Sequence, residues 1–247
     1  MRTLLLTLQY AGTACAGWQR QSGARTVQGE VEAALGRLVG EAGIAIHGAG
    51  RTDAGVHARE QAAHFVTVST LSCDRIRAAL NHFLPWDIRV TDVRDTHPDF
   101  HARRAAVSKE YRYRIWRGET MPPFLHPYAL LVKRPLDLAA MRESAGLLVG
   151  THDFAALRSA GSSAETTVRT ITRSEWLEAG AELVYAVEAN GFLYRMVRCI
   201  VGTLLEVGRG RRRPEDITSL LASKDRALAG PVAPARGLHL WRIVYPE

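Results

Sequence analysis

Hydrophobic residues recur with two different periods along the first hundred residues. The helical spacing of Val27, Val31, Leu35 and Leu38 predicts a helix that begins near Thr26. Short runs rich in β-branched and aromatic residues, bounded by turn residues, predict strands. The other elements expected in this half are strands at 3–10, 43–47, 61–68 and 87–94, and a helix from a cap at Asp74 to Leu84.

A similar series of elements begins again after residue 107. Residues 108–117 (SKEYRYRIWR) alternate with period two, which predicts a strand with Tyr111 and Tyr113 on one face and arginines on the other. The elements that follow are a helix capped by Asp137, strands at 170–179 and 182–189, a helix at 192–208, a short helix from Pro214 and a strand at 237–245.

The order strand–helix–strand–strand in each half predicts an α+β fold. We expect two related subdomains with mainly antiparallel sheets, residues 1–105 and 106–247. On the helix 192–208, the residues Arg195, Arg198, Gly202 and Glu206 form a narrow non-apolar stripe. This stripe is either an ordinary solvated face or a surface that presents an arginine to a site.

Composition adds a partner class to this picture. The chain of 247 residues carries a net charge of +7, and only three of its 32 basic residues are lysines. The positive charge favours a polyanionic partner such as a nucleic acid, although an arginine bias alone also produces it.

Three widely spaced cysteines without a Cys-x-x-Cys motif predict a reducing compartment and no structural zinc. Pro98 argues against a helix that presents His97 and His101 to a metal ion. No apolar run is long enough for a signal peptide or a membrane span, so we expect a cytoplasmic protein without a membrane partner.

The segment GAGRTDAGVHA at 48–58 holds the candidate chemistry. Its glycines permit tight turns and close approach of a ligand, so the loop can place the carboxylate of Asp53 in a cleft. Asp-Ala-Gly is also an ordinary turn sequence. Full burial raises the pKa of a carboxyl group by roughly 3–5 units, whereas one close guanidinium lowers it by about 1–3 units. A buried nucleophilic aspartate therefore needs an arginine partner, and the helix 192–208 offers Arg198.

Motifs distributed along the whole chain resemble the tRNA pseudouridine synthase A (TruA) family. They are GAGRTDAGVHA with HF at 64–65, LP at 84–85, FHAR at 100–103, KEYRYRI at 109–115, GTHDF at 150–154, MVRCIVGTLLEVG at 196–208 and GLHLWRIVY at 237–245. Arg59-Glu60 and Arg104-Ala105 depart from the family pattern, but neither pair falls on a matched catalytic position.

The resemblance implies a pseudouridine synthase fold, in which duplicated ferredoxin-like subdomains flank a central basic cleft, and an isomerase that needs no cofactor. The reaction would convert uridine to pseudouridine at tRNA positions 38, 39 and 40, in the anticodon stem-loop. The family is homodimeric, and each tRNA spans both subunits. A non-catalytic RNA-binding or RNA-folding protein on the same scaffold, and a synthase aimed at other uridines, are the alternatives.

The same resemblance assigns roles to five residues. Asp53 would be the nucleophile, Arg51 would help to displace the target nucleotide, and Tyr111 would stack on the uracil. Arg198 would pair with the aspartate, and Leu238 would pack beside the base. The candidates for phosphate contacts are Arg20, Arg25, Arg103, Arg104, Arg209, Arg211, Arg212 and Arg213. The run 208–214 is otherwise a solvated loop.

Overall fold

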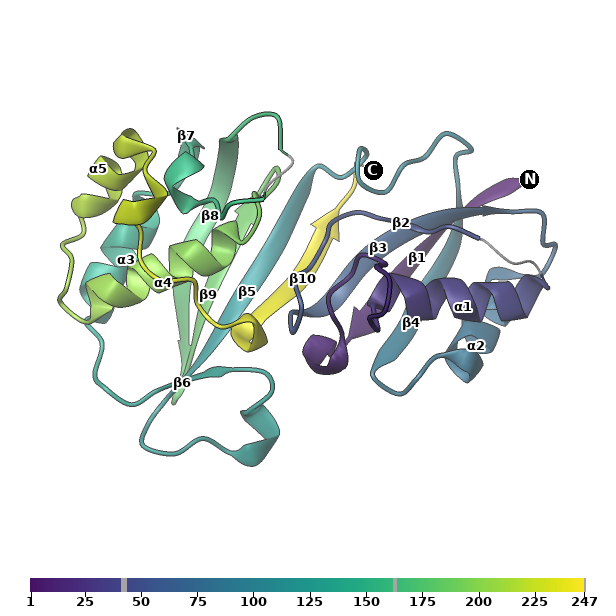
Figure 1. The fold of residues 1–247 in the computed structure, drawn as a ribbon, viewed down its shortest axis with the longest axis horizontal. Coiled ribbons are helices and arrows are strands. Elements are labelled where there is room, and N and C mark those ends of the chain that lie inside the picture. The colour runs from purple at the N-terminus through teal and green to yellow at the C-terminus, as the bar shows by residue number, and fades with distance from the viewer. Residues whose placement is uncertain (41–43, 162–163, 247) are drawn as a thin grey trace. The chain divides into compact units, whose positions relative to one another are not determined.

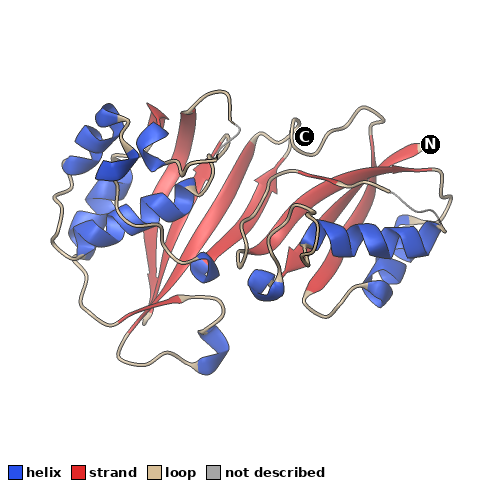
Figure 2. Cartoon of the chain, viewed as in Figure 1, coloured by secondary structure: helices blue, strands red, loops and turns tan. Residues whose placement is uncertain are grey.

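The computed structural model describes residues 1–40, 44–161 and 164–246. The chain divides into two compact units, each with its own strands and helices (Figures 1 and 2). Unit 1 consists of residues 1–107 together with the chain from Leu240 onward, and unit 2 is Ser108–His239.

The C-terminal segment belongs to unit 1, which differs from the division at 105/106 expected from the sequence. The Tyr245 hydroxyl donates to the carbonyl oxygen of Ala102 (2.9 Å), and the Val107 amide donates to that of Val244 (2.8 Å). The ring of Tyr245 also lies 5.3 Å from that of Phe100. These contacts hold the end of the chain to unit 1, although the preceding residues belong to unit 2.

Unit 1 contains an antiparallel sheet in which β4 pairs with β1, β1 with β3, and β3 with β2. Its elements are β1 (Arg2–Tyr10), η1 (Gly12–Ala14), α1 (Val27–Val39), β2 (His47–Gly48), β3 (His57–Thr67), α2 (Cys73–Phe83) and β4 (Ile88–Thr96). Leu4, Leu6 and Leu8 of β1 are fully buried, as their alternate spacing on one strand face requires. Leu5 belongs to a separate cluster with Ala62.

The helices of unit 1 begin where polar side chains cap them. The Thr26 hydroxyl accepts from the amide of Gly29 (3.2 Å) at the start of α1, as predicted. The cap of α2 is Ser72, which accepts from the amide of Arg75 (3.4 Å), and the prediction of Asp74 is therefore wrong by two residues. Residue 43, the start of the expected strand 43–47, lies outside the described residues.

Unit 2 is built on the antiparallel strands β5, β9, β8 and β7, with β6 parallel to β5. Its elements are β5 (Ser108–Arg117), η2 (Pro123–Leu125), β6 (Leu130–Val132), α3 (Leu138–Gly146), β7 (Gly150–Asp153), η3 (Ala155–Leu157), β8 (Val168–Ala179), β9 (Glu182–Ala189), α4 (Met196–Gly208), α5 (Asp216–Ser223), η4 (Arg226–Leu228) and η5 (Ala235–Gly237). The final strand, β10 (Leu238–Val244), begins in unit 2 and continues into unit 1.

The two units repeat one plan, which confirms the predicted α+β class with mainly antiparallel pairing. In unit 1 the chain runs β1–α1–β2–β3–α2, and its first strand pairs with its third, β3, which pairs with β2. In unit 2 the strands β5, β9 and β8 have the same relation around α3 and α4. The additional strands β6 and β7, of three and four residues, were not predicted.

Helix α4 begins at Met196, four residues later than predicted. Arg195 has φ 58°, in the left-handed region that a right-handed helix excludes. The segment 192–195 is therefore a non-helical entry to α4, although its hydrophobic pattern matches that of the helix. Asp137 caps α3 as predicted, and α5 begins at Asp216, two residues after Pro214.

Candidate active site

The Asp53 loop, residues 49–56, connects β2 to β3 in unit 1. Its three central side chains differ in exposure: Arg51 is exposed, Thr52 is buried and Asp53 is partly buried. The loop therefore anchors itself through Thr52 and presents the charged groups on either side of that residue. Gly55, with φ +77°, takes a backbone conformation that favours glycine, so the turn after Asp53 needs this residue.

Main-chain hydrogen bonds hold the Asp53 loop against the segment that follows β1. The amide of Trp18 donates to the carbonyl oxygen of Thr52 (3.0 Å), and the amide of Gly55 donates to that of Cys15 (3.3 Å). Within the loop, the amide of Val56 donates to the carbonyl oxygen of Asp53 (3.1 Å). These hydrogen bonds fix the backbone on both sides of Asp53.

Two glycines make this close backbone contact possible. A Cβ atom added at Gly12 would lie 1.9 Å from the carbonyl oxygen of Val56, and one added at Gly17 would lie 2.6 Å from that of Thr52. Any larger residue would push the two segments apart. These glycines lie more than thirty residues before the Asp53 loop, so no local pattern connects them with it.

Side chains of β1 and β3 form hydrogen bonds with the Asp53 loop. The Tyr10 hydroxyl lies 2.9 Å from the Thr52 hydroxyl, and Gln61 Nε2 donates to the carbonyl oxygen of Gly50 (2.9 Å). Sequence reasoning missed Tyr10 and Gln61 as members of the site, because neither lies in the loop and no spacing rule connects them to it.

Tyr111 and Tyr113 occupy the apolar face of β5 in unit 2, as predicted. Tyr111 is 7% exposed, and its ring meets the ring of Phe192 edge to face at a centroid distance of 5.0 Å. Tyr113 is fully buried, and its hydroxyl donates to the carbonyl oxygen of Pro234 (2.8 Å). Phe192 was predicted to be part of a helix. It lies instead in the non-helical entry to α4, where its ring fixes the orientation of the Tyr111 ring.

Arg198 lies near the start of α4, against the segment 231–234. Its Nε donates to the carbonyl oxygen of Ala233 (2.7 Å), and its own carbonyl oxygen accepts from the amide of Ala233 (3.0 Å). A Cβ added at Gly202 would lie 1.6 Å from the carbonyl oxygen of Pro231. The segment 231–234 therefore covers the stripe at Arg198 and Gly202, whereas Arg195 is exposed, and the solvated-face interpretation is wrong for Gly202.

Leu238 follows Gly237 at the start of β10 and is 6% exposed. A Cβ added at Gly237 would lie 2.6 Å from the Tyr113 ring, so the chain passes directly over β5 here. Burial raises the pKa of Tyr113 above its ordinary value, and the nearby charges of Arg198 and Arg236 partly oppose this shift. Within unit 2, Arg198 and the segment that leads to Leu238 therefore both lie near Tyr113 of β5.

The predicted site residues belong to two different units. Asp53 and Arg51 lie in unit 1, whereas Tyr111, Arg198 and Leu238 lie in unit 2. The pairing of Asp53 with Arg198 and the basic cleft between subdomains therefore stay predictions.

The first two candidate phosphate contacts are engaged in ion pairs within unit 1. The guanidinium of Arg25 donates two hydrogen bonds to Asp87 (2.7 and 2.8 Å) and one to Glu30 (2.7 Å). The hydrogen bond from Arg25 holds the pKa of Asp87 below its usual value. Arg20 is more exposed and lies 3.0 Å from the carboxylate of Glu32. Arg25 thus has a structural role that accounts for its position.

Two of the four candidates after α4, Arg209 and Arg211, line a hollow of about 420 Å³ in unit 2. It is lined by Arg134, Pro135, Arg209 and Arg211, and both Arg209 and Arg211 lie 3.2 Å from the carboxylate of Glu206. Arg134 was not predicted, since it lies more than seventy residues before the others. Arg213 pairs with Asp216 (3.3 Å), and Arg212 is half-buried.

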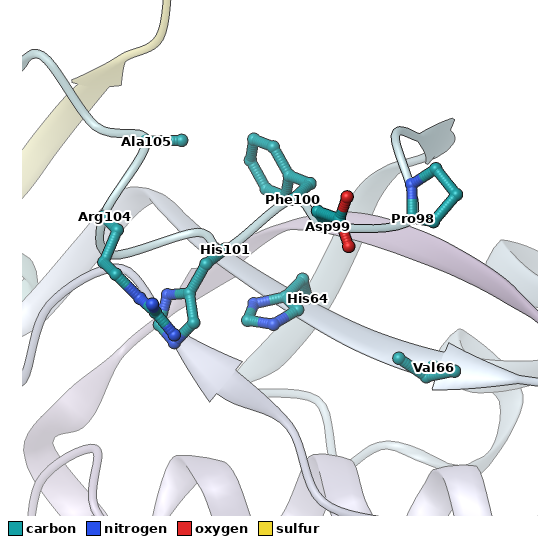
Figure 3. Close-up of a pocket in the computed structure, with 8 residues that line it drawn as sticks. All are labelled: His64, Val66, Pro98, Asp99, Phe100, His101, Arg104 and Ala105. Atoms are coloured by element: carbon teal, nitrogen blue, oxygen red, sulfur yellow. The ribbon is translucent and has the colours of Figure 1, made fainter.

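A second hollow of about 420 Å³, in unit 1, is shown in Figure 3. The rings of His64 and His101 lie 4.7 Å apart in it, near Phe100 and the exposed Arg104. His64 is 6% exposed, and its Nδ1 accepts from the amide of Ala102 (3.2 Å). Burial, with the charges of His101 and then His47, lowers its pKa from 6.5 to about 4. His64 is therefore neutral at physiological pH. Arg103, the remaining candidate, is also exposed.

Within residues 1–40, 44–161 and 164–246, no group of three or more His, Cys, Asp or Glu side chains is placed to hold a metal ion. No helix in that part of the chain is long and apolar enough to cross a membrane.

Comparison with known proteins connects this fold and loop to one family. The sequence model of the family described as tRNA pseudouridine synthase matches residues 7–103 and 145–246. The tRNA pseudouridine synthase A of Geobacillus kaustophilus is 48% identical over 97% of this chain and 93% of its own length. That of Brevibacillus brevis is 46% identical over 99% and 100%.

A further relative is the tRNA pseudouridine synthase A 1 of Desulfotalea psychrophila, 44% identical over 99% of this chain and all of its own. A solved chain from a Cbf5-Nop10-Gar1 complex is 14% identical and covers 82% of this chain and 45% of its own, with a TM-score of 0.34, which is too low to support an argument. The sequence relatives extend over nearly the whole chain at more than 40% identity, and on this basis the chain belongs to the tRNA pseudouridine synthase family.

Proposed function

We propose that this chain isomerises uridine to pseudouridine in the anticodon stem-loop of tRNA, at positions 38, 39 and 40, with Asp53 as the nucleophile. Family membership supports the reaction and the tRNA substrate. The observation that carries the role of Asp53 is its loop, whose backbone is fixed on both sides of a partly exposed carboxylate. A nucleophile has to be held in this way, because a misplacement of about 1 Å costs on the order of a hundredfold in rate.

The reaction is balanced without an external reactant. The bond between N1 of the uracil and C1′ of the ribose breaks, the base turns, and a bond forms between C5 and C1′. The hydrogen on C5 leaves as a proton, and N1 gains a proton. The protein must supply a nucleophile, a site that retains the detached base, and a group that stabilises negative charge.

We assign the other groups by their surroundings within each unit. Tyr111 offers an aromatic ring whose orientation is set by Phe192, which suits stacking on the uracil. Arg198 has its guanidinium oriented by the bond from Nε to Ala233, which suits pairing with the carboxylate of Asp53. Leu238 offers an apolar side chain for the base.

Arg51 is exposed beside Asp53, and it suits the space vacated when the target nucleotide leaves the stem. Extracting a base costs a few kcal/mol, and stacking on an aromatic ring returns about 1–3 kcal/mol. Phosphate contacts therefore supply the remainder. Among the candidates, Arg209 and Arg211 are best placed, since they line a basic hollow with Arg134.

We further propose that the chain acts as a homodimer in the cytoplasm, without a cofactor. The homodimer rests on the family resemblance alone. Sedimentation of the purified protein with and without tRNA tests the dimer, and a single monomeric species under both conditions would contradict it.

Release of tritium from uridine C5 tests the reaction itself. An anticodon stem-loop labelled at C5 is incubated with the wild-type protein and with the Asp53→Asn variant, and the label in the solvent is counted. We expect release by the wild type and only background release by Asp53→Asn, with similar stem-loop binding. Binding without release by the wild type would instead support the RNA-binding protein of the same scaffold.

A further inference from the structure

Three buried polar side chains form a hydrogen-bonded series that includes one residue of the Asp53 loop. Gln61 is fully buried on β3, Tyr10 is 4% exposed at the end of β1, and Thr52 is 7% exposed in the loop. The Gln61 Nε2 lies 3.3 Å from the Tyr10 hydroxyl, which lies 2.9 Å from the Thr52 hydroxyl. Burial of a polar group costs free energy unless the group is hydrogen-bonded. The hydrogen bonds among these three side chains therefore have to offset the cost of their burial.

Gln61 donates to the Tyr10 hydroxyl, and either hydroxyl of the Tyr10–Thr52 pair can be the donor. Gln61 Oε1 accepts from the amide of Ala62 (3.2 Å), and Nε2 donates to the carbonyl oxygen of Gly50 (2.9 Å) and to the Tyr10 hydroxyl. Since the Tyr10 oxygen accepts from Gln61, its own hydrogen is available for Thr52. Burial raises the pKa of Tyr10 above its ordinary value, so that hydrogen is retained.

The hydrogen bonds of Gln61 and Tyr10 reach the Asp53 loop at Gly50 and at Thr52. Gln61 holds the carbonyl of Gly50, and Tyr10 holds the side chain of Thr52, the residue directly before Asp53. On the other side, the amide of Trp18 holds the carbonyl of Thr52. Thr52 is therefore fixed through both its side chain and its main chain.

We propose that the Tyr10 hydroxyl, supported by Gln61, is a positioning group for the catalytic carboxylate: it sets the orientation of Thr52 and thereby the direction in which Asp53 leaves the backbone. This inference rests on the proposed role of Asp53. Tyr10 and Gln61 do not touch the substrate in this assignment. Their effect is expected in the rate of the chemical step rather than in the binding of tRNA.

The test uses Tyr10→Phe, which removes the hydroxyl and keeps the ring. Its matched control is Tyr185→Phe in unit 2, because the Tyr185 hydroxyl is equally buried and lies 2.7 Å from a single hydroxyl partner, Ser174. Each variant loses one buried hydroxyl pair, and Tyr10→Phe also loses the hydrogen bond from Gln61, so its melting temperature should fall at least as far as that of Tyr185→Phe. Only Tyr10→Phe should change catalysis.

We expect Tyr10→Phe to lower kcat on the labelled stem-loop about tenfold, with KM and the dissociation constant of the stem-loop within about twofold of wild type. Tyr185→Phe should retain the wild-type kcat. Equal kcat values for the two variants, or a change confined to KM, would overturn the proposal.

A second pair of variants keeps the proposal testable if Tyr10→Phe does not fold. Thr52→Ser retains the hydroxyl and should keep kcat near wild type, whereas Thr52→Val removes it and should lower kcat as Tyr10→Phe does. Because both changes break the same contact, the double variant Tyr10→Phe/Thr52→Val should be no slower than the slower single variant. Equal kcat values for Thr52→Ser and Thr52→Val, or fully multiplicative losses in the double variant, would overturn it.

The failure of this inference differs from a failure of the proposed function. A wild-type protein that releases no tritium would remove the role of Asp53 itself. A wild-type protein that is active, together with a Tyr10→Phe variant as active as Tyr185→Phe, would leave the function intact and reject only the positioning role.

Discussion

At the scale of single residues, the arginines of this chain divide by what holds them. Arg198 is oriented by a main-chain carbonyl and belongs to the proposed catalytic set. Arg25 is held by two carboxylates, and Arg209 and Arg211 share the carboxylate of Glu206 beside a hollow. In the sequence these residues are all arginines and cannot be distinguished by type. In the structure their hydrogen-bond and ion-pair partners distinguish them.

Arg198→Ala should abolish tritium release while tRNA binding is largely retained. The variant removes the guanidinium proposed to stabilise the charge of Asp53, and this interaction contributes to the reaction rather than to affinity. Single-turnover rates and filter binding of the same stem-loop separate the two effects. Weakened binding with normal turnover would make Arg198 a phosphate contact instead.

Arg25→Gln should destabilise unit 1 by about 2 kcal/mol, since it leaves Asp87, whose side chain is 6% exposed, without its cation. Urea denaturation measures this loss. The salt dependence of tRNA binding should keep its wild-type slope, because the guanidinium is already occupied. A slope reduced by about one, with unchanged stability, would show instead that Arg25 contacts a phosphate.

At the scale of elements, close backbone contacts join the segment after β1 to the Asp53 loop. Their contact depends on Gly12 and Gly17, where a Cβ would collide with a carbonyl oxygen of the other segment. The hydrogen bond from the amide of Gly12 to His57 Nδ1 (3.1 Å) extends this contact to the start of β3. The position of Asp53 is therefore set by elements that are distant in sequence.

Gly12→Ala should lower both stability and activity. The added methyl group would lie 1.9 Å from the Val56 carbonyl oxygen, so the Asp53 loop has to move. We expect a loss of about 2 kcal/mol or more in the free energy of unfolding and a fall of at least tenfold in kcat. Gly146→Ala in α3 is the control, since its added Cβ would meet no atom within 4 Å apart from its chain neighbours and the backbone of its own helix. Equal effects of the two variants would contradict this interpretation.

His64 should make unit 1 less stable in acid. Its pKa is about 4 in the folded chain and 6.5 without its neighbours, chiefly because of burial. Between these values the unfolded state binds more protons, so the contribution of His64 is complete above pH 6.5 and is lost as the pH falls toward 4.

His64→Asn tests this dependence, since an amide oxygen can still accept from the amide of Ala102 and the side chain does not titrate. Denaturation curves from pH 8 to pH 4 should show a smaller loss of stability for the variant than for the wild type. Parallel losses in the two proteins would contradict the assignment.

At the scale of the whole molecule, periodicity predicted most long elements and the repeated plan of the two units. It failed where a local conformation outweighed the pattern, as at Arg195, and at short strands such as β6, which only their partners stabilise. The loop of Asp53 could be recognised from its glycines. The support from Tyr10 and Gln61 could not, because those contacts join residues 42 and 51 positions apart.

A modification map of tRNA links the chemistry of Asp53 to the whole protein. Total tRNA is prepared from cells that lack this chain, and from the same cells supplied with the wild type or with Asp53→Asn at equal protein level. Pseudouridine is then mapped at single-nucleotide resolution. We predict that the anticodon stem-loop uridines are modified with the wild type and unmodified with Asp53→Asn. Full modification with Asp53→Asn, or an unchanged map when the chain is absent, would contradict the assignment.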